Sequence, residues 1–404
     1  MNATFPIILT LNGGSSSIRF AVYRLGTLLE LRLSGKLDRV GGAKPRLSFT
    51  HAGGEQQELA CNAASDYRSA VAALLAWFDS QKILDGLSAV GHRIVHGMHR
   101  TAPELITQEL LDELHLIVQL DPEHLPGEIA LIEALRTRAP ALLQVACFDT
   151  EFHQNMPQVA TLMAIPRRFA AKGVQRYGFH GLSYRYLMEE LNSAAGNVVA
   201  NGRVILAHLG NGASMTAVKD GVSIDTSMGF TPASGLVMGT RSGDIDPGLG
   251  AYLARTEQMT ASQFDAMINH ESGLLGVSET SADMGDLLAI EKTEPRAAEA
   301  VALFCYQAKK QMGAYAAALG GLDTLVFAGG IGENAAIVRA RICDGLGFLG
   351  IELDVAQNSA NAEVISSDAS RVSVRVVRTD EELMIARSVC RVLGYTSPTG
   401  EILP

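Results

Sequence analysis

The chain has 404 residues, of which 47% are hydrophobic and 19% are charged, and its formal net charge is −10. A disordered chain needs low hydrophobicity and dense charge, so this composition excludes one, and the length suits two or three domains. The acidic balance, with no Lys/Arg run longer than two residues, argues against nucleic acid as a main partner.

The cysteines and the apolar segments indicate a cytoplasmic protein that does not enter a membrane. The first apolar run, at residues 7–11, is too short for a signal sequence, and no segment approaches the ~18 apolar residues of a membrane span. The cysteines are widely spaced and form no CxxC pair, which is typical of a reducing compartment. They are Cys61, Cys147, Cys305, Cys343 and Cys390.

Predicted strands and helices alternate along the chain, which favours an α/β fold with mixed sheets. Helices are predicted at residues 64–79, 108–120, 128–138, 184–194, 261–269 and 297–319, with another beginning at residue 335. Strands are predicted at residues 89–92, 142–148, 325–328 and 372–377. Residues 230–250 are predicted to be a surface loop that carries function, and a domain boundary is expected near residue 150.

Two segments, residues 7–23 and 204–218, follow the same pattern. Each has an apolar strand, a turn of Gly, Ser and Asn, and then a second strand. Aligning Ser17 with Ser214 also aligns Gly13 with Gly210. The repeat predicts two related α/β halves with a cleft between them.

Glycine turns end three predicted strands, at residues 12–17, 208–214 and 329–334. Backbone N–H groups of such turns can surround an anion, and three in one acidic chain favour a polyphosphate ligand. No GxxxxGK[ST] motif occurs, which excludes a P-loop.

A dinucleotide fingerprint is an alternative for the third glycine turn. Gly330, Gly332 and Ala335 have the required spacing, and Glu352 or Asp354 follows about 20 residues on. This alternative leaves the other two turns unexplained.

Arginines and histidines near the predicted strand ends are candidates for chemistry. Arg93 lies just past a short apolar strand, and Arg241 lies in a loop with two carboxylates; each either pairs with an acid or awaits an anionic substrate. His92 and His96 are four residues apart, which raises zinc as an alternative, although the sequence between them favours a strand. His180 lies between glycines, next to the apolar ring of Phe179.

Carboxylates follow two further predicted strands. Asp149 comes directly after the strand at residues 142–148, where α/β proteins place catalytic groups. Thr379 is predicted to cap a helix, with Glu382 completing a capping box. Glu381 and Glu382 are then either first-turn carboxylates, which the pattern favours, or ligands for Mg²⁺.

Taken together, these motifs resemble the acetate kinase family of the sugar kinase, Hsp70 and actin superfamily. The motifs that carry the resemblance lie, in family order, at residues 12–17, 91–97, 148–154, 176–181, 208–214, 238–247, 330–334 and 379–387. The resemblance implies two related domains of the ribonuclease H-like type with an interdomain active-site cleft. Residues 1–150 with 386–404 would form one domain, and residues 151–385 the other, which carries most of the nucleotide site.

The same resemblance implies a role for each matching position. The catalytic residues would be Arg93, Asp149, His180 and Arg241. The substrate site would include Arg93, Val95, His124, Phe179 and Pro232. The ATP site would include Arg19, His208, Leu209, Gly210, Asn211, Gly212, Asp283, Met284, Gly285, Gly330, Ile331, Gly332, Glu333 and Asn334. Asn12 and Glu381, in preference to Glu382, would hold the metal ion.

The implied activity is reversible transfer of a phosphoryl group from ATP to acetate by direct in-line attack, with Mg²⁺ (or Mn²⁺) as cofactor. The implied partners are ATP or ADP, a short-chain carboxylate and a second copy of the chain. Propionate or butyrate as the acid, and an actin-like ATPase without an acid substrate, are alternatives.

Four positions depart from the family pattern. Arg19 stands in place of a lysine, Met98 in place of a glycine, and Gly285 in place of an arginine, which removes one cation from the ATP side. Glu123 falls where the family has a pocket leucine. Since its carboxylate would repel an anionic substrate, Glu123 is expected to point away or to pair with a cation.

Overall fold

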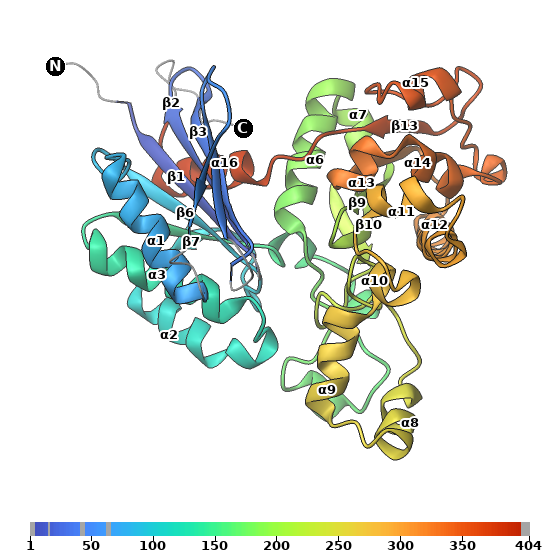
Figure 1. Cartoon of the computed structure of the whole chain (residues 1–404). Coiled ribbons are helices and arrows are strands. Elements are labelled where there is room, and N and C mark those ends of the chain that lie inside the picture. The colour runs from blue at the N-terminus through green and yellow to red at the C-terminus, as the bar shows by residue number, and fades with distance from the viewer. Residues whose placement is uncertain (1–4, 15–16, 41–44, 62–65, 397–404) are drawn as a thin grey trace. The chain divides into compact units, whose positions relative to one another are not determined.

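The computed structural model describes residues 5–14, 17–40, 45–61 and 66–396, so Ser15 and Ser16 of the first glycine motif lie outside the described residues. The chain divides into two compact units (Figure 1). Unit 1 comprises residues 1–151 and 380–404, and unit 2 comprises residues 152–379. Among the described helices, none has both the length and the apolarity needed to cross a bilayer.

Unit 1 is built on an eight-stranded sheet with the order β5-β4-β3-β2-β1-β6-β8-β7. Its strands are β1 (Ile7–Gly13), β2 (Ser17–Leu25), β3 (Leu29–Asp38), β4 (Arg46–His51), β5 (Gln57–Ala60), β6 (Ala89–Ile94), β7 (Glu104–Leu105) and β8 (Leu143–Phe148). β6 is parallel to both β1 and β8. The carboxyl ends of these three strands therefore lie together at one edge of the sheet.

Helices cover both faces of this sheet. Leu9 and Leu11 share a core with α1 (Tyr67–Ser80) and α3 (Leu125–Arg138). Side chains alternate along a strand, so Thr10 and its register partner Gly91 point to the other face. That face is covered by α16 (Glu381–Leu393), where a Cβ atom at Gly91 would lie 2.4 Å from Ile385 Cγ2. The remaining helices of unit 1 are α2 (Gln108–Leu116) and the short η1 (Val118–Leu120).

Unit 2 is built on a five-stranded sheet with the order β11-β10-β9-β12-β13. Its strands are β9 (Arg203–Leu209), β10 (Ala213–Lys219), β11 (Val222–Thr226), β12 (Thr324–Ala328) and β13 (Ser373–Val376). β12 is parallel to both β9 and β13. Here too, three parallel strands end at one edge of the sheet.

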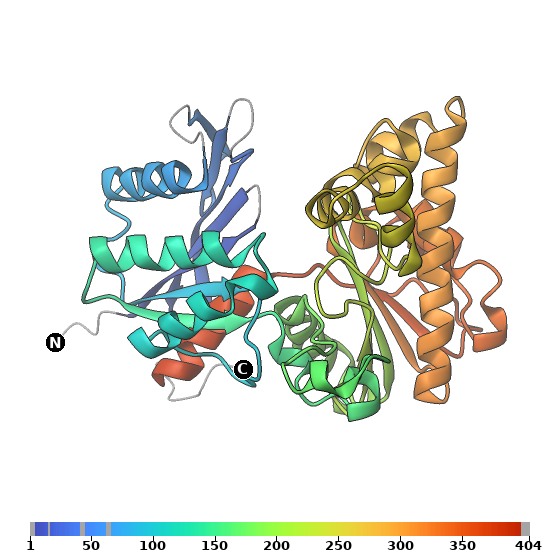
Figure 2. The same cartoon turned by 90° about the horizontal axis from the view of Figure 1, so that it is seen from below.

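Two helices flank the sheet of unit 2. Tyr184, Leu187 and Leu191 of α6 (Gly181–Ala195) pack against Leu206 and Val326. The long helix α12 (Pro295–Leu319) packs against β9 and β10 on the side away from α6, as Figure 2 shows in orange.

Short helices make up the rest of unit 2. They are η2 (Glu151–His153), which spans the boundary of the units, α4 (Gln158–Thr161), α5 (Arg167–Ala170), α7 (Asn197–Ala200), α8 (Gly248–Thr256), α9 (Ala261–Ala266), η3 (Met267–Glu271), α10 (Gly273–Ser278), α11 (Met284–Ile290), α13 (Gly329–Asn334), α14 (Ala336–Cys343), η4 (Gly347–Leu349) and α15 (Val355–Ser359). Residues 230–247 contain neither helix nor strand, as predicted, but Ala233 and Leu236–Met238 are buried rather than at the surface, and α8 begins at Gly248.

The two sheets confirm the predicted duplication. In each, a three-stranded antiparallel meander (β1–β3 or β9–β11) is followed by two parallel strands beside its first strand (β6 and β8, or β12 and β13). The similar segments at residues 7–23 and 204–218 form the first hairpin of each sheet. The Gly/Ser/Asn turns therefore occupy equivalent places in two related units.

Two local predictions were wrong. Residues 329–334, predicted to be a turn, form the short helix α13. Thr379 does not cap the last helix: Asp380 is the N-cap, and its carboxylate accepts the Leu383 N–H at 2.8 Å. Asp and Thr are both favourable N-cap residues, so the sequence pattern could not decide between Thr379 and Asp380 as the cap.

Gly91 should be required by the packing of α16. We expect Gly91→Ala to lower the free energy of unfolding by about 1–3 kcal/mol, since the new methyl group overlaps Ile385 and Val389. Gly313 in α12 is the matched control: a Cβ atom there would meet nothing within 4 Å, so Gly313→Ala should stabilise by up to about 1 kcal/mol. Thermal unfolding of both variants tests this, and equal shifts would contradict it.

Candidate active site

In unit 1, polar side chains meet at the shared edge of the parallel strands. Asn12 lies at the carboxyl end of β1, Arg93 near the end of β6, and Asp149 directly after β8. The strand order β1-β6-β8 makes them neighbours although 56 residues separate Arg93 from Asp149. The sequence predicted each of these positions, and the sheet brings them together.

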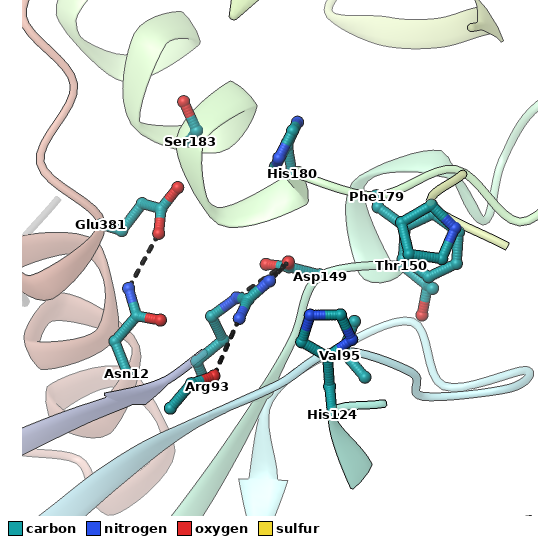
Figure 3. A network of polar contacts seen from close by, with 12 residues as sticks. Asn12, Arg93, Val95, His124, Asp149, Thr150, Phe179, His180, Ser183 and Glu381 are labelled. Atoms are coloured by element: carbon teal, nitrogen blue, oxygen red, sulfur yellow. Dashed lines mark hydrogen bonds and ion pairs between the residues drawn. The ribbon is translucent and has the colours of Figure 1, made fainter. Parts of the chain in front are cut away.

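Arg93 is held on several sides (Figure 3). Its Nε and Nη2 donate to Asp149 Oδ2 at 2.9 and 2.6 Å, and its Nη1 donates to the Gly13 carbonyl oxygen at 3.1 Å. Nη1 also lies 3.9 Å from Glu128 Oε1. The guanidinium therefore has a fixed orientation before any substrate binds.

Charge compensation keeps this pair ionised. Burial opposes the charge on Arg93, but the carboxylate of Asp149 favours it, and the pKa of the guanidinium is raised. Burial raises the pKa of Asp149, and Arg93 opposes that rise. Since two guanidinium N–H groups donate to a single oxygen of Asp149, we regard the pair as an ion pair near neutral pH.

A second group lies beside it, where β1 meets the start of α16. Asn12 Nδ2 donates to Glu381 Oε2 at 2.9 Å, the dashed contact in Figure 3, and to Glu382 Oε1 at 3.3 Å. Burial, and then the nearby Glu381 carboxylate, raise the pKa of Glu382. Two carboxylates and an amide are the oxygen donors that Mg²⁺ prefers, so these residues fit a divalent cation.

The segment before α3 agrees with the expectation that Glu123 does not enter a buried pocket. Glu123 is exposed, whereas Asp121, two residues earlier, is buried. His124 Nδ1 is hydrogen-bonded to Asp121 Oδ1 at 2.9 Å. Val95, the residue directly after β6, is buried. The pKa of Asp121 is lowered because His124 and then Arg93 outweigh the effect of burial.

In unit 2, His180 occupies the N-cap position of α6. Its backbone is left-handed, with φ of 62°. The preceding residue, Phe179, is buried, and both residues are labelled in Figure 3. His180 Nδ1 is hydrogen-bonded to Ser214 Oγ at 2.8 Å, and Ser214 is also hydrogen-bonded to the Tyr184 hydroxyl. These buried hydroxyls fix the orientation of the imidazole ring.

His208 lies against His180. Their rings stack with centroids 4.4 Å apart and an interplanar angle of 26°. His208 Nδ1 is hydrogen-bonded to Ser183 Oγ at 2.8 Å, and Ser183 in turn to Thr379 Oγ1 at 2.8 Å. The two histidines are thus oriented in the same way, each through Nδ1 and a serine.

Arg241 and His180 converge on the glycine turn after β9. A Cβ atom at Gly212 would lie 3.3 Å from His180 Nε2 and 3.7 Å from Arg241 Nη2. Arg241 Nη1 donates to the Pro232 carbonyl at 2.9 Å. Unit 2 therefore brings together one predicted pocket residue and the two catalytic groups predicted in this half of the chain.

The glycine-rich helix α13 lies beside this turn. A Cβ atom at Gly210 would be 3.8 Å from the Gly330 nitrogen of α13. Glu333 accepts the Gly329 N–H at 2.9 Å and the Thr379 N–H at 3.1 Å, so its carboxylate links the start of α13 to the backbone of Thr379.

The buried Arg339 binds the carboxyl end of α13. It donates to the Gly332 and Glu333 carbonyls at 2.8 and 3.0 Å and otherwise to neutral oxygens of Asn358 and Asn361. Burial lowers the pKa of this guanidinium. None of these contacts is with a carboxylate.

The other residues predicted for a nucleotide site lie at the start of α11 and on β2, away from the turn after β9 in the sequence. Asp283 is the N-cap of α11 and accepts the Asp286 N–H at 3.0 Å, and Gly285 is exposed in its first turn. Met284 between them is buried. Arg19 belongs to unit 1, where it faces Asn12 across the β1–β2 pair.

Several supporting residues were not found by sequence reasoning. Ser183 and Ser214 orient the two histidines, Asp121 orients His124, and Glu128 faces Arg93. Ser183 lies three residues after His180, a helical spacing that could have indicated it.

The zinc alternative finds no support in the part of the chain that the structure describes. His92 is bonded to Gln144, and His96 Nδ1 accepts the Met98 N–H at 3.1 Å. No group of three or more His, Cys, Asp or Glu residues that could hold a metal occurs among the described residues.

Known proteins share both the fold and the sequence. The crystal structure of Porphyromonas gingivalis acetate kinase matches with a TM-score of 0.85 and 37% identity, covering 96% of this chain and 100% of that one. The acetate kinase of Rhodopseudomonas palustris is 44% identical over 393 residues, 96% of this chain and 98% of that protein. The propionate kinase of Escherichia fergusonii is 40% identical over 391 residues, 95% and 96% of the two chains.

These likenesses define the class of the protein as an enzyme built from two related α/β units. The family model described as the acetokinase family matches residues 7–387. The chain belongs to the acetokinase family. The dinucleotide alternative for residues 330–335 is thereby excluded.

His153 should make the stability of unit 2 dependent on pH. Its Nε2 donates to the Phe179 carbonyl at 3.1 Å, and burial lowers its pKa to about 4, against 6.5 in an unfolded chain. As the pH falls, His153 is therefore protonated in the unfolded chain before it is protonated in the folded one. Its contribution to the free energy of unfolding is full above pH 6.5 and decreases as the pH drops toward 4. We expect His153→Gln to reduce the slope of unfolding free energy against pH in this window.

Urea unfolding between pH 4.5 and 7.5 measures that slope. His92 and His96 have similarly lowered pKa values of about 4, so the variant should retain part of the dependence. An unchanged slope would contradict the assignment to His153.

Proposed function

We propose that this protein is an acetate kinase, which reversibly transfers the γ-phosphoryl group of ATP to acetate and forms acetyl phosphate and ADP. The observation that carries the proposal is Arg93, fixed by Asp149 at the strand ends of a chain 44% identical to an acetate kinase. A fixed, buried guanidinium suits the recognition of a small carboxylate.

The chemistry requires little acid–base catalysis. Acetate is ionised near neutral pH, because carboxyl pKa values lie near 4, so the nucleophile needs no general base. The obstacle is to bring one anion up to another, and positive groups in a closed site offset that repulsion. In unit 1, Arg93 supplies such a charge.

Asp149 is a positioning residue in this mechanism rather than a proton acceptor. Its Oδ2 receives both hydrogen bonds from Arg93, so the carboxylate aims the guanidinium. Phosphoryl transfer then proceeds by direct in-line attack of the substrate carboxylate, without a phosphorylated aspartate or glutamate.

His180 and Arg241 stabilise the phosphoryl group in transit. Both lie around Gly212 in unit 2, and both carry N–H groups that can donate to its oxygens. Ser214 holds the imidazole in place through Nδ1, so that Nε2 can donate. That this group and the Arg93 group act in one cleft remains a prediction.

The glycine turns of unit 2 are proposed to bind ATP. The turn at residues 208–212 and α13 lie side by side at the strand ends. Their backbone N–H groups suit phosphate oxygens. Exposed Asp283 and Gly285 leave the nucleoside side without the cation that the family pattern has there.

A divalent cation, Mg²⁺ or Mn²⁺, would be held by Asn12 and Glu381, with Glu382 adjacent. When bound, such an ion neutralises phosphate charge. Asn12 also bridges the two carboxylates, which keeps their oxygens near each other.

We propose further that the protein acts as a homodimer in the cytoplasm, which the family resemblance and the cysteine usage support. Light scattering on the purified protein should give a mass twice that of one chain. A mass equal to one chain would remove this part of the proposal.

The two arginines should be required for transfer. We expect Arg93→Ala and Arg241→Ala to lower kcat/KM for acetate by about 10³–10⁵, since each removes a positive charge beside the reacting anions. The assay incubates the protein with MgATP, acetate and hydroxylamine and measures the acyl hydroxamate. Arg255→Ala on the exposed face of α8 is the matched control and should behave as the wild type.

The preferred acid follows from the same assay with formate, acetate, propionate and butyrate. We expect acetate to give the highest kcat/KM, and a higher value for propionate would assign the protein to the activity named for its propionate kinase relatives. If no acid gives a hydroxamate, the proposed function fails. Slow ATP hydrolysis that Arg93→Ala leaves unchanged would instead indicate an ATPase without an acid substrate.

A further inference from the structure

Residues 121–128, which lead into α3 and include its first turn, carry three acidic side chains that differ in burial. Glu123, which the sequence singled out, is exposed. Asp121 and Glu128 are 4% and 2% exposed. Asp121 is accounted for by its bonds to His124, whereas Glu128 has no role in the mechanism above.

Glu128 contacts two residues of the proposed substrate site at once. Its Oε2 accepts the backbone N–H of Val95 at 2.9 Å, and its Oε1 lies 3.9 Å from Arg93 Nη1. Oε1 has no hydrogen-bond partner among the described residues. A single carboxyl group thus links the guanidinium of Arg93 to the backbone of Val95.

Little space is left around this link. A Cβ atom at Gly13 would lie 2.6 Å from the Tyr67 hydroxyl oxygen and 3.7 Å from Glu128 Cγ. The Gly13 carbonyl accepts from the same Nη1 of Arg93 that faces Glu128. The Glu128 side chain therefore lies close to the Gly13 backbone, whose carbonyl accepts from Arg93.

We propose that Glu128 is a positioning residue for the carboxylate substrate, which holds Val95 and limits the movement of Arg93 at the site where the acid binds. This inference rests on the proposed function. It adds a residue that determines how tightly the acid is held, and it leaves the ATP side of the site unchanged.

The charge of Glu128 should then matter for binding of the acid. The ionisable groups that face it are Arg93 from β6, Asp149 after β8, Asp121 before α3 and Tyr67 from α1. Burial is the largest influence and, although Arg93 opposes it, raises the pKa of Glu128 to about 8. The group is therefore neutral at pH 7 and ionises as the pH rises through 8, which places a second carboxylate near Arg93 and opposes the substrate anion.

The test measures KM for acetate and for ATP in Glu128→Ala and Glu128→Gln. Alanine removes the acceptor of the buried Val95 N–H, so KM for acetate should rise about tenfold or more at pH 7, while KM for ATP changes less than about twofold. Glutamine retains an acceptor and cannot ionise. Its KM for acetate should stay within about threefold of wild type at pH 7.

The pH profile provides a readout that a purely structural residue would not change. From pH 7 to 9, KM for acetate should rise in the wild type and stay level in Glu128→Gln. Glu133→Gln, an exposed position on the same helix, is the matched control and should retain the rise. If alanine does not fold, the glutamine profile decides alone.

The proposal is overturned if Glu128→Ala binds acetate as the wild type does, or if Glu128→Gln retains the wild-type profile. Equal changes in both KM values would also overturn it. These failures differ from failure of the proposed function, in which the wild type itself forms no acyl hydroxamate.

Discussion

The ion pair of Arg93 with Asp149 is the constraint on which the proposed chemistry of unit 1 depends. It exists because β6 and β8 are parallel neighbours whose carboxyl ends place the two side chains together. A guanidinium that must recognise a small anion has to be positioned and still charged, and a buried carboxylate achieves both. Burial of Asp149 strengthens the pair because little water competes for its oxygens.

The same architecture serves different chemistry in the two units. Both sheets join an antiparallel meander to two parallel strands. In unit 1 the strand ends carry charged side chains, including Arg93 and the carboxylates around Asn12. In unit 2 they carry glycine-rich segments and two stacked histidines. The two related units therefore carry different residue types at equivalent strand ends.

Much of this was predictable because it depends on local pattern. Apolar strands followed by polar or glycine residues identified Asn12, Arg93, Asp149 and the turn after β9, and the similarity of residues 7–23 to 204–218 predicted the repeated topology. The prediction of Thr379 as a cap and of a turn at residues 329–334 was wrong because neighbouring residues have similar local preferences. The capping residue and the conformation of residues 329–334 were decided by burial and tertiary contacts, which no local pattern contains.

The sequence by itself determined the α/β class, the duplicated hairpins and most of the residue types at the strand ends, since strand periodicity and turn chemistry act over a few residues. The tertiary structure alone decided which acids face which cations. It exposed Glu123, buried Asp121 and Glu128, and placed neutral acceptors around Arg339 within the part of the chain that the structure describes. The physical reason is that the ionisation and orientation of a charged group depend on burial and on partners distant in the chain, which only the folded protein supplies.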